Sequence, residues 1–130
     1  MTTKNYISDL SGKNREAIIV ASLGTISYEL AEIDHPHKVL IRGAMGAAMG
    51  CALGIALNTN KKVICLIGDG SFLMKMGSIS TILHHNLPNL EIHVIDNGQY
   101  LSCGGQKTNF KTVDQIVNSL PKFTVFKPVV

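Results

Sequence analysis

Five short apolar runs are spaced along the chain, and helical patterns separate them. The runs are rich in Ile, Val and Leu, and we expect β-strands at residues 17–21, 38–41, 62–67, 91–95 and 123–126. Helices are expected at residues 25–33, 44–57, 71–85 and 112–120. Strands without alternating polar positions are typical of a parallel sheet that is covered on both faces. The pattern therefore predicts one α/β domain over residues 1–130, built on a doubly wound parallel sheet.

Glycine or a small polar residue occurs wherever one of the first four predicted strands ends. The four junctions are residues 22–25 (SLGT), 43–46 (GAMG), 68–71 (GDGS) and 96–98 (DNG). The carboxyl ends of parallel strands share one edge of the sheet, and ligands bind outside that edge. We therefore expect the four junctions to form one site.

Composition narrows the range of functions. The 130 residues carry a formal net charge of +3 with no basic stripe, so nucleic-acid binding is not indicated. Cys51, Cys65 and Cys103 lack metal-ligand spacing, which favours free thiols in a reducing cytoplasm. The N-terminus shows no signal-peptide pattern. The apolar stretch 44–57 is shorter than the roughly 20 residues that span a bilayer, so we expect a soluble protein.

The stretch from Gly68 to Asn97 carries the most specific signal. Gly70 would let a phosphate approach the backbone, and the helix expected to start near Ser71 would present free N–H groups to it. Asp69 beside an anion implies a mediating cation. Asn97 ends the neighbouring strand, and adjacent strands lie about 4.8 Å apart, so Asp69 and Asn97 can ligate one ion. Hard oxygen ligands of this kind suit Mg²⁺.

This arrangement resembles the GDG…N signature of thiamine diphosphate enzymes, and the similarity extends from Ala21 to about Thr108. Residues 22–30 (SLGTISYEL) are similar to the first loop and helix of sulfopyruvate and phosphonopyruvate decarboxylases. Residues 43–46 resemble their G-S-M-G motif, and residues 104–108 (GGQKT) a G-G-Q motif. Among these enzymes, the β subunits of sulfopyruvate decarboxylase carry only the diphosphate-binding domain. The resemblance implies that fold, shortened here at its C-terminus because the sequence ends before the last helix and strand of relatives.

The resemblance also implies roles for the junction residues. Asp69 and the side chain of Asn97 would bind Mg²⁺, with the main-chain carbonyl of Gln99 as the third protein ligand. Gly70 and Ser71 would hold the diphosphate. The implied cofactor-binding residues are Gly24, Thr25, Gly43, Ala44, Met45, Gly68, Asp69, Gly70, Ser71, Asn97, Gln99 and Tyr100.

Four residues before Gly68 are implied to shape the rest of the cofactor site. The carbonyl of Gly43 would accept a hydrogen bond from the aminopyrimidine group, and Gly24 and Thr25 would line the diphosphate side. Met45 would be the apolar wedge that bends the cofactor into a V shape. A bulky unbranched side chain among Gly and Ala suits that role, although ordinary helix packing of Met45 remains open.

The resemblance implies a 2-oxo acid decarboxylase whose active site is shared between two chains. In this family a glutamate on a separate, pyrimidine-binding domain promotes formation of the cofactor carbanion. None of the four glutamates lies in a matching context; they are Glu16, Glu29, Glu32 and Glu91. We therefore expect a pyrimidine-binding partner subunit, a hetero-oligomer, and no activity of this chain alone.

Several alternatives stay open at the level of sequence. Ser102 and Cys103 are either substrate contacts or parts of a simple loop, and Lys107 is a candidate for an anionic substrate tail. The chain could instead serve a thiamine diphosphate carboligase or oxidoreductase, or be a non-catalytic cofactor-binding or regulatory protein. A nucleotide-binding domain is disfavoured, because neither G-x-G-x-x-G nor a P-loop lysine motif is present.

Overall fold

A parallel sheet forms the centre of the molecule in the computed structural model, which describes residues 1–101 and 104–129. Its five strands run in the order β2-β1-β3-β4-β5, and each neighbouring pair is parallel. The strands are β1 (Ile18–Ala21), β2 (Lys38–Leu40), β3 (Val63–Gly68), β4 (Leu90–Ile95) and β5 (Phe123–Phe126). All five predicted strands are confirmed, with boundaries that differ by one residue at most.

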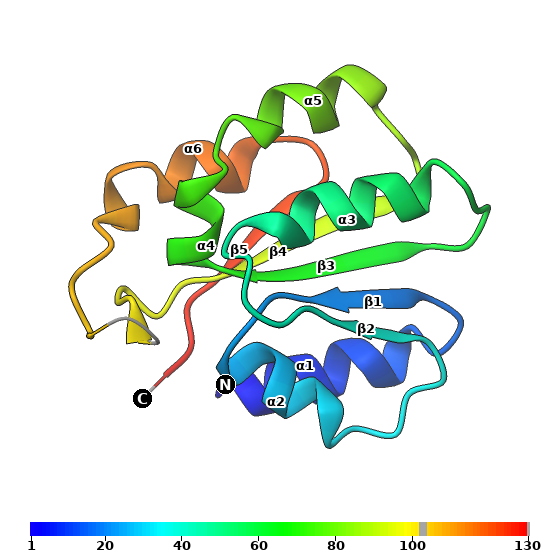
Figure 1. The fold of residues 1–130 in the computed structure, drawn as a ribbon, viewed down its shortest axis with the longest axis horizontal. Coiled ribbons are helices and arrows are strands. Elements are labelled where there is room, and N and C mark those ends of the chain that lie inside the picture. The colour runs from blue at the N-terminus through cyan, green and yellow to red at the C-terminus, as the bar shows by residue number, and fades with distance from the viewer. Residues whose placement is uncertain (102–103, 130) are drawn as a thin grey trace.

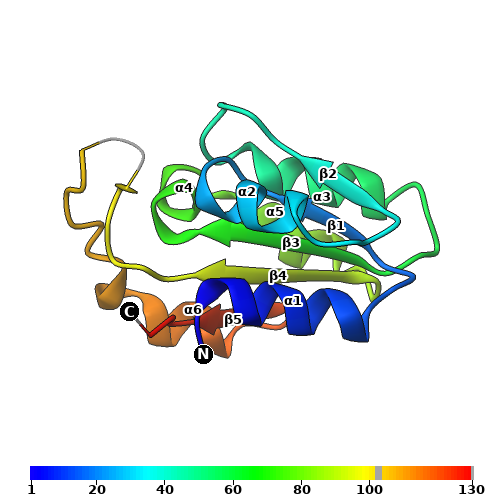
Figure 2. The same ribbon diagram turned by 90° about the horizontal axis from the view of Figure 1, so that it is seen from below.

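Helices cover both faces of the sheet, so the predicted doubly wound α/β fold is confirmed (Figures 1 and 2). The helices α1 (Thr3–Lys13) and α2 (Thr25–Ala31) lie on one face. The other face carries α3 (Ala47–Ala56), α4 (Asp69–Met74), α5 (Ser78–His85) and α6 (Asp114–Ser119), and a 3₁₀ turn, η2 (Phe110–Thr112), precedes α6. Within the described residues, none of these helices has the length and apolar character needed to cross a membrane.

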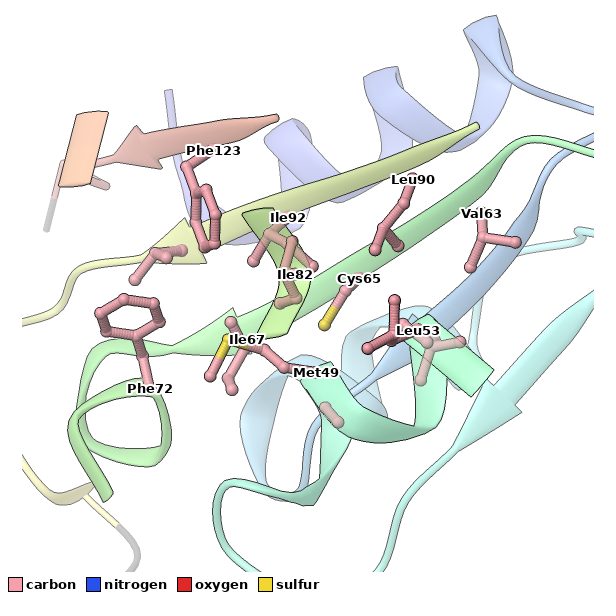
Figure 3. Close-up of a cluster of buried hydrophobic side chains, with 14 of the residues drawn as sticks. Met49, Leu53, Val63, Cys65, Ile67, Phe72, Ile82, Leu90, Ile92 and Phe123 are labelled. Atoms are coloured by element: carbon pink, nitrogen blue, oxygen red, sulfur yellow. The ribbon is translucent and has the colours of Figure 1, made fainter. Parts of the chain in front are cut away.

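The larger part of the core lies between the sheet and helices α3 to α6. Figure 3 shows side chains of this cluster that come from the strands and from α3, α4 and α5. Five successive residues of β3 are buried, which is the reason for the unbroken apolar run in the sequence. Small residues of α3 let that helix approach the strands closely, and Met49 fills the space next to Ile67 (Figure 3). Cys65 is a free, fully buried thiol, and burial raises its pKa well above the ordinary value.

Helix α1 was not anticipated from the sequence, because few apolar positions mark it. Only Ile7 and Ser11 are buried among its residues. The helix begins with a cap, since the Thr2 side chain accepts a hydrogen bond from the backbone N–H of Asn5 at 3.1 Å. Tyr6 attaches it to the sheet by stacking on Phe126 with ring centroids 4.0 Å apart. The apolar face of α1 is narrow, because it consists of the buried Ile7 with Tyr6 and Leu10 packed beside it.

The helix expected at residues 71–85 is divided in two. Its first part starts earlier than predicted, at Asp69, and ends at Met74, while α5 begins at Ser78. Between them the backbone makes bonds three residues apart, such as Ser78 N–H to the carbonyl of Lys75 at 2.8 Å. Gly77 lies in this break and weakens the helical pattern there. The break leaves α4 as a single short turn of helix against the edge of the sheet.

Candidate active site

One cavity lies at the carboxyl edge of the sheet, beside the ends of β1 and β3. After β1 the chain enters α2 on one face, whereas the connection to β3 runs through α3 on the other face. Such a reversal of direction is where open α/β sheets bind their ligands. The residues that line the cavity are Ser22, Leu23, Thr25, Ile26, Met45, Gly68, Asp69, Gly70, Ser71, Asn97, Gln99, Tyr100 and Leu101.

The structure brings most of the predicted site residues together. Thr25, Met45, residues 68–71, Asn97, Gln99 and Tyr100 all line this cavity. Gly24 and Gly43 line a second cavity of about 550 Å³, between α2 and β2, that shares Leu23 with the first. Ala44 lines neither cavity, although its positive φ of 49° places it in the same tight turn as Gly43 and Gly46. The predicted grouping of the junctions is thus observed.

Asp69 is the buried acidic group at the centre of the edge. It is the first residue of α4 and has 1% of its surface exposed. Its Oδ2 atom accepts two hydrogen bonds, from the backbone N–H of Gly98 at 3.1 Å and from the hydroxyl of Thr108 at 2.5 Å. The bond to Thr108 is at the short end of the range for hydrogen bonds between two oxygen atoms. These two donors hold the carboxylate in one orientation.

A second carboxyl group lies beside Asp69, at the end of the neighbouring strand. Gly68 pairs with Ile95 in the sheet, so Asp69 and Asp96 follow directly from paired positions. Burial raises the pKa of Asp96, and the nearby acidic group of Asp69 raises it further. Asp69 lines this cavity, and Asp96 lines the adjoining cavity that shares Asn97 and Gln99 with it, so the two acidic groups concentrate negative charge at this edge of the sheet. A divalent cation with oxygen ligands would neutralise that charge, and these residues therefore fit a magnesium site.

Asn97 and Gln99 approach the same cavity from the loop after β4. The Asn97 side-chain oxygen accepts a hydrogen bond from the backbone N–H of Gln99 at 2.9 Å, which forms a tight Asx turn. Both residues are exposed, in contrast to Asp69. Within the described residues no group of three or more His, Cys, Asp or Glu side chains could hold a metal ion. The predicted donor set is of another kind, because it combines a carboxylate with an amide and a backbone carbonyl.

Gly70 has a packing role that the sequence did not indicate. It lies within the first turn of α4 and has no positive φ, so backbone strain does not require glycine there. A Cβ atom added at this position would lie 2.6 Å from Cδ1 of Tyr100 and 2.7 Å from Cε1. The ring of Tyr100 therefore covers Gly70 directly. The helix expected to start near Ser71 in fact begins at Asp69, so Asp69 and Gly70 are already helical.

Two residues make contacts at the site that the sequence did not predict, namely Ser22 and Thr108. Ser22 is buried, and its hydroxyl oxygen lies 3.4 Å from the backbone nitrogen of Gly68, which joins the ends of β1 and β3. Thr108 is buried and hydrogen-bonded to Asp69. Each has a weak sequence signal, because Ser22 ends a strand and Thr108 ends the Gly-Gly-Gln stretch. Only the fold shows which atoms they contact.

Three candidate substrate contacts have different outcomes. Lys107 is exposed and lines a separate cavity with Lys111 on the far side of the loop after β4. It does not line the cavity that holds Asp69, although the cavity that it lines shares Asn97 and Gln99 with that one. Ser102 and Cys103 lie outside the described residues, and their predicted roles remain predictions.

Comparison with known proteins gives the same assignment for most of the chain. Residues 22–127 match the family described as thiamine pyrophosphate enzyme, C-terminal TPP binding domain. The sulfopyruvate decarboxylase subunit beta of Methanocaldococcus jannaschii is 45% identical over 93 residues, which are 71% of this chain and 50% of that protein. A phosphonopyruvate decarboxylase of Streptomyces viridochromogenes is 42% identical over 102 residues, which are 77% of this chain and 25% of that protein. The chain thus spans a quarter to about half of the length of these relatives.

A solved structure shows the same fold at lower sequence similarity. The 2-oxoglutarate:ferredoxin oxidoreductase from Magnetococcus marinus superimposes with a TM-score of 0.62 and 22% identity, over 81% of this chain and 36% of that one. At this identity the likeness concerns the arrangement of strands and helices. It supports the α/β architecture built around the cavity.

Proposed function

We propose a function from the premise that this chain belongs to the thiamine pyrophosphate enzymes, as their C-terminal cofactor-binding domain. The proposal is that it binds the diphosphate of thiamine diphosphate, through Mg²⁺, as one subunit of a 2-oxo acid decarboxylase. The main support is one cavity that is lined by the proposed metal ligands, Asp69, Asn97 and Gln99, together with Gly68, Gly70, Ser71, Thr25 and Met45. These residues follow the ends of separate strands, and the fold brings them together at one edge of the sheet.

The cation site of the proposal uses Asp69, the side chain of Asn97 and the main-chain carbonyl of Gln99. Support comes from the oxygen character of all three donors and from Asp69 and Asp96, two acidic residues that follow paired strand positions at this edge of the sheet. The diphosphate would lie against the backbone of Gly70 and Ser71. Support comes from the position of both residues in the lining of the cavity, at the start of α4.

The remainder of the cofactor would extend toward the turn of residues 43–46. The carbonyl of Gly43 would accept a hydrogen bond from the aminopyrimidine group, and Met45 would support the bend of the molecule. Support comes from the position of Met45 in the lining of the main cavity and of Gly43 in the lining of the adjoining one. When bound, thiamine diphosphate supplies a carbanion and an electron sink for decarboxylation. This chain positions the cofactor.

A partner subunit belongs to the proposal. The match to a subunit named beta supports it, as does the absence of a suitable glutamate near the cavity among the described residues. The substrate would be a small anionic 2-oxo acid, as the names of the sulfopyruvate and phosphonopyruvate decarboxylases suggest. The complex would act in the cytoplasm, in keeping with the free thiols of Cys51 and Cys65. The chain alone would be inactive.

Thermal unfolding of the chain, co-purified with the partner that it binds, tests the cofactor assignment. Mg²⁺ with thiamine diphosphate should raise the melting temperature by several degrees, because a ligand that binds only the folded state stabilises it. Asp69→Ala should remove this rise, whereas Asp34→Ala, which removes an exposed carboxylate remote from the cavity, should keep it. An equal rise in the Asp69 variant would contradict the proposed cation site. Release of CO₂ from a 2-oxo acid by the same complex then tests the reaction.

A further inference from the structure

The carboxylate of Asp69 has one oxygen that is fully occupied by the protein. An ionised carboxylate only accepts hydrogen bonds, and each of its oxygens has about two acceptor positions. Oδ2 of Asp69 takes both of its donors from the loop after β4, namely the N–H of Gly98 and the hydroxyl of Thr108. A cation that binds Asp69 would therefore use the other oxygen, Oδ1.

Thr108 is held in place by the backbone of the loop rather than by its own side chain. Its N–H donates to the carbonyl of Gly98 at 3.0 Å, and Gln99 and Lys107 pair across the loop as an isolated antiparallel bridge. The N–H of Tyr100 donates to the carbonyl of Gln106 at 2.8 Å. The ends of the loop are thus closed on each other. Thr108 is 6% exposed, so its hydroxyl meets Asp69 largely shielded from water.

We propose that Thr108 is a positioning residue for the cation site. Its hydroxyl fixes the rotation of the Asp69 carboxylate and leaves Oδ1 for the divalent ion, a role that rests on the proposed function. Without the hydroxyl, Oδ2 keeps one donor, and the carboxylate gains freedom to turn toward other partners.

A purely structural role for Thr108 makes a different prediction. The hydroxyl oxygen also lies 3.3 Å from the backbone nitrogen of Phe110, and the methyl group lies near Gly70. If those contacts mattered most, loss of the methyl group or of the loop geometry would have the larger effect. Serine keeps the hydroxyl and loses the methyl, whereas valine keeps the volume and loses the hydroxyl. The two substitutions therefore separate the roles.

The experiment measures Mn²⁺ binding by electron paramagnetic resonance, in the complex of the full chain with its partner and in the presence of thiamine diphosphate. Removal of an outer hydrogen-bond partner typically weakens metal binding about 10- to 100-fold, and we expect an increase of this size in the Kd of Thr108→Val. Thr108→Ser should stay within about threefold of the wild-type value, because its hydroxyl still donates to Asp69. The melting temperature without metal is recorded for each variant.

Three outcomes decide the matter. Wild-type Mn²⁺ affinity in Thr108→Val, or an equal loss in the valine and serine variants, would overturn the proposal. If Thr108→Val does not fold, Thr108→Ala against Thr108→Ser provides the same comparison. Asp69→Ala separates this proposal from the function on which it rests. Retained Mn²⁺ binding in Asp69→Ala means that the cation site itself is wrong, whereas lost binding there with normal binding in Thr108→Val rejects the positioning role alone.

Discussion

Glu91 and His93 lie within strand β4, whereas Asp96 and Asn97 follow its carboxyl end, and the two polar clusters are built differently. In the first cluster, Nδ1 of His93 lies 2.6 Å from the hydroxyl of Tyr6, and Nε2 lies 3.0 Å from Oε1 of Glu91. The other oxygen of Glu91 lies 2.8 Å from the ammonium group of Lys62. Each polar group of this first cluster lies beside a partner of complementary charge or hydrogen-bonding type. The cluster fastens α1 to the sheet.

The acidic groups of the two clusters have different neighbours. In the second cluster Asp96 lies beside Asp69, whereas Glu91 in the first cluster lies beside Lys62 and His93. Burial would raise the pKa of Glu91, but hydrogen bonds from Lys62 and His93 lower it below the ordinary value. Burial raises the pKa of Asp96, and the carboxylate of Asp69 adds to this increase. The opposite pKa shifts distinguish Glu91, whose carboxylate is paired with Lys62 and His93, from Asp96, which lies beside another acidic group. The comparison separates structural polar groups from the proposed ligand site.

The same chemical change at the two clusters should have opposite consequences, and the largest effect is expected at Asp69. Asp69→Asn should weaken binding of Mg²⁺ with thiamine diphosphate by about 100-fold or more, because even outer partners of a metal contribute 10- to 100-fold. Stability without metal should stay the same or rise, since the substitution removes repulsion from Asp96. Isothermal titration calorimetry on the complex and urea unfolding measure the two quantities.

Glu91→Gln is the matched control for that substitution. It should lower the free energy of unfolding, because the contacts with Lys62 and His93 lose their charge, and it should leave cofactor affinity unchanged. A large loss of cofactor affinity in Glu91→Gln, or none in Asp69→Asn, would remove the distinction between the clusters.

Gly70→Ala tests whether the ring of Tyr100 forms part of the second cluster. The new Cβ would overlap the ring, and overpacking of this kind costs about 1–3 kcal/mol of stability. Gly54→Ala in α3 is the control, because no heavy atom lies within 4 Å of its added Cβ, and it should stabilise the protein by up to about 1 kcal/mol. Unfolding in urea measures both. Recovery in the double variant Gly70→Ala with Tyr100→Ala would identify the ring as the cause, and the absence of a loss in Gly70→Ala would contradict the contact.

Tyr6→Phe tests the first cluster in isolation. Removal of the hydroxyl leaves Nδ1 of the buried His93 without its partner, which should cost about 1–2 kcal/mol of unfolding free energy. The stacking on Phe126 is retained by phenylalanine, so the helix should stay in place. Circular dichroism in urea provides the measurement. Cofactor affinity should be that of the wild-type protein, and a decrease would show that the two clusters are coupled.

The smallest expected effect is the pH dependence of the same tyrosine. Burial, and then the charge of Glu91, raises the pKa of Tyr6 from 10.0 to about 12. The folded state therefore holds the phenolic proton more tightly than the unfolded state, and the stabilisation present below pH 10 is lost as the pH rises toward 12. After allowance for the partial exposure of the ring, we expect less than about 1 kcal/mol. The difference between wild type and Tyr6→Phe should shrink over this range in urea unfolding, and a constant difference would contradict the shift.

The apolar runs and the glycine-bearing junctions determined the fold class and the edge of the sheet at which the cavity lies. Unbroken runs such as that of β3 are buried on both faces, and parallel strands place their carboxyl ends together without any further information. The spacing of Asp69 and Asn97 likewise followed from one helical crossover between adjacent strands. These features are local or periodic, which is why a single sequence shows them.

Contacts between distant segments were decided only by the tertiary structure. Thr108 reaches Asp69 across 39 positions of sequence, and Tyr6 reaches His93 across 87. The ring of Tyr100 over Gly70 depends in the same way on how the loop after β4 closes on itself. Each contact depends on the path of a loop or the packing of a helix, and several residues could satisfy the same local pattern. The sequence determined where the chemistry is placed, and the fold decided which side chains hold it in position.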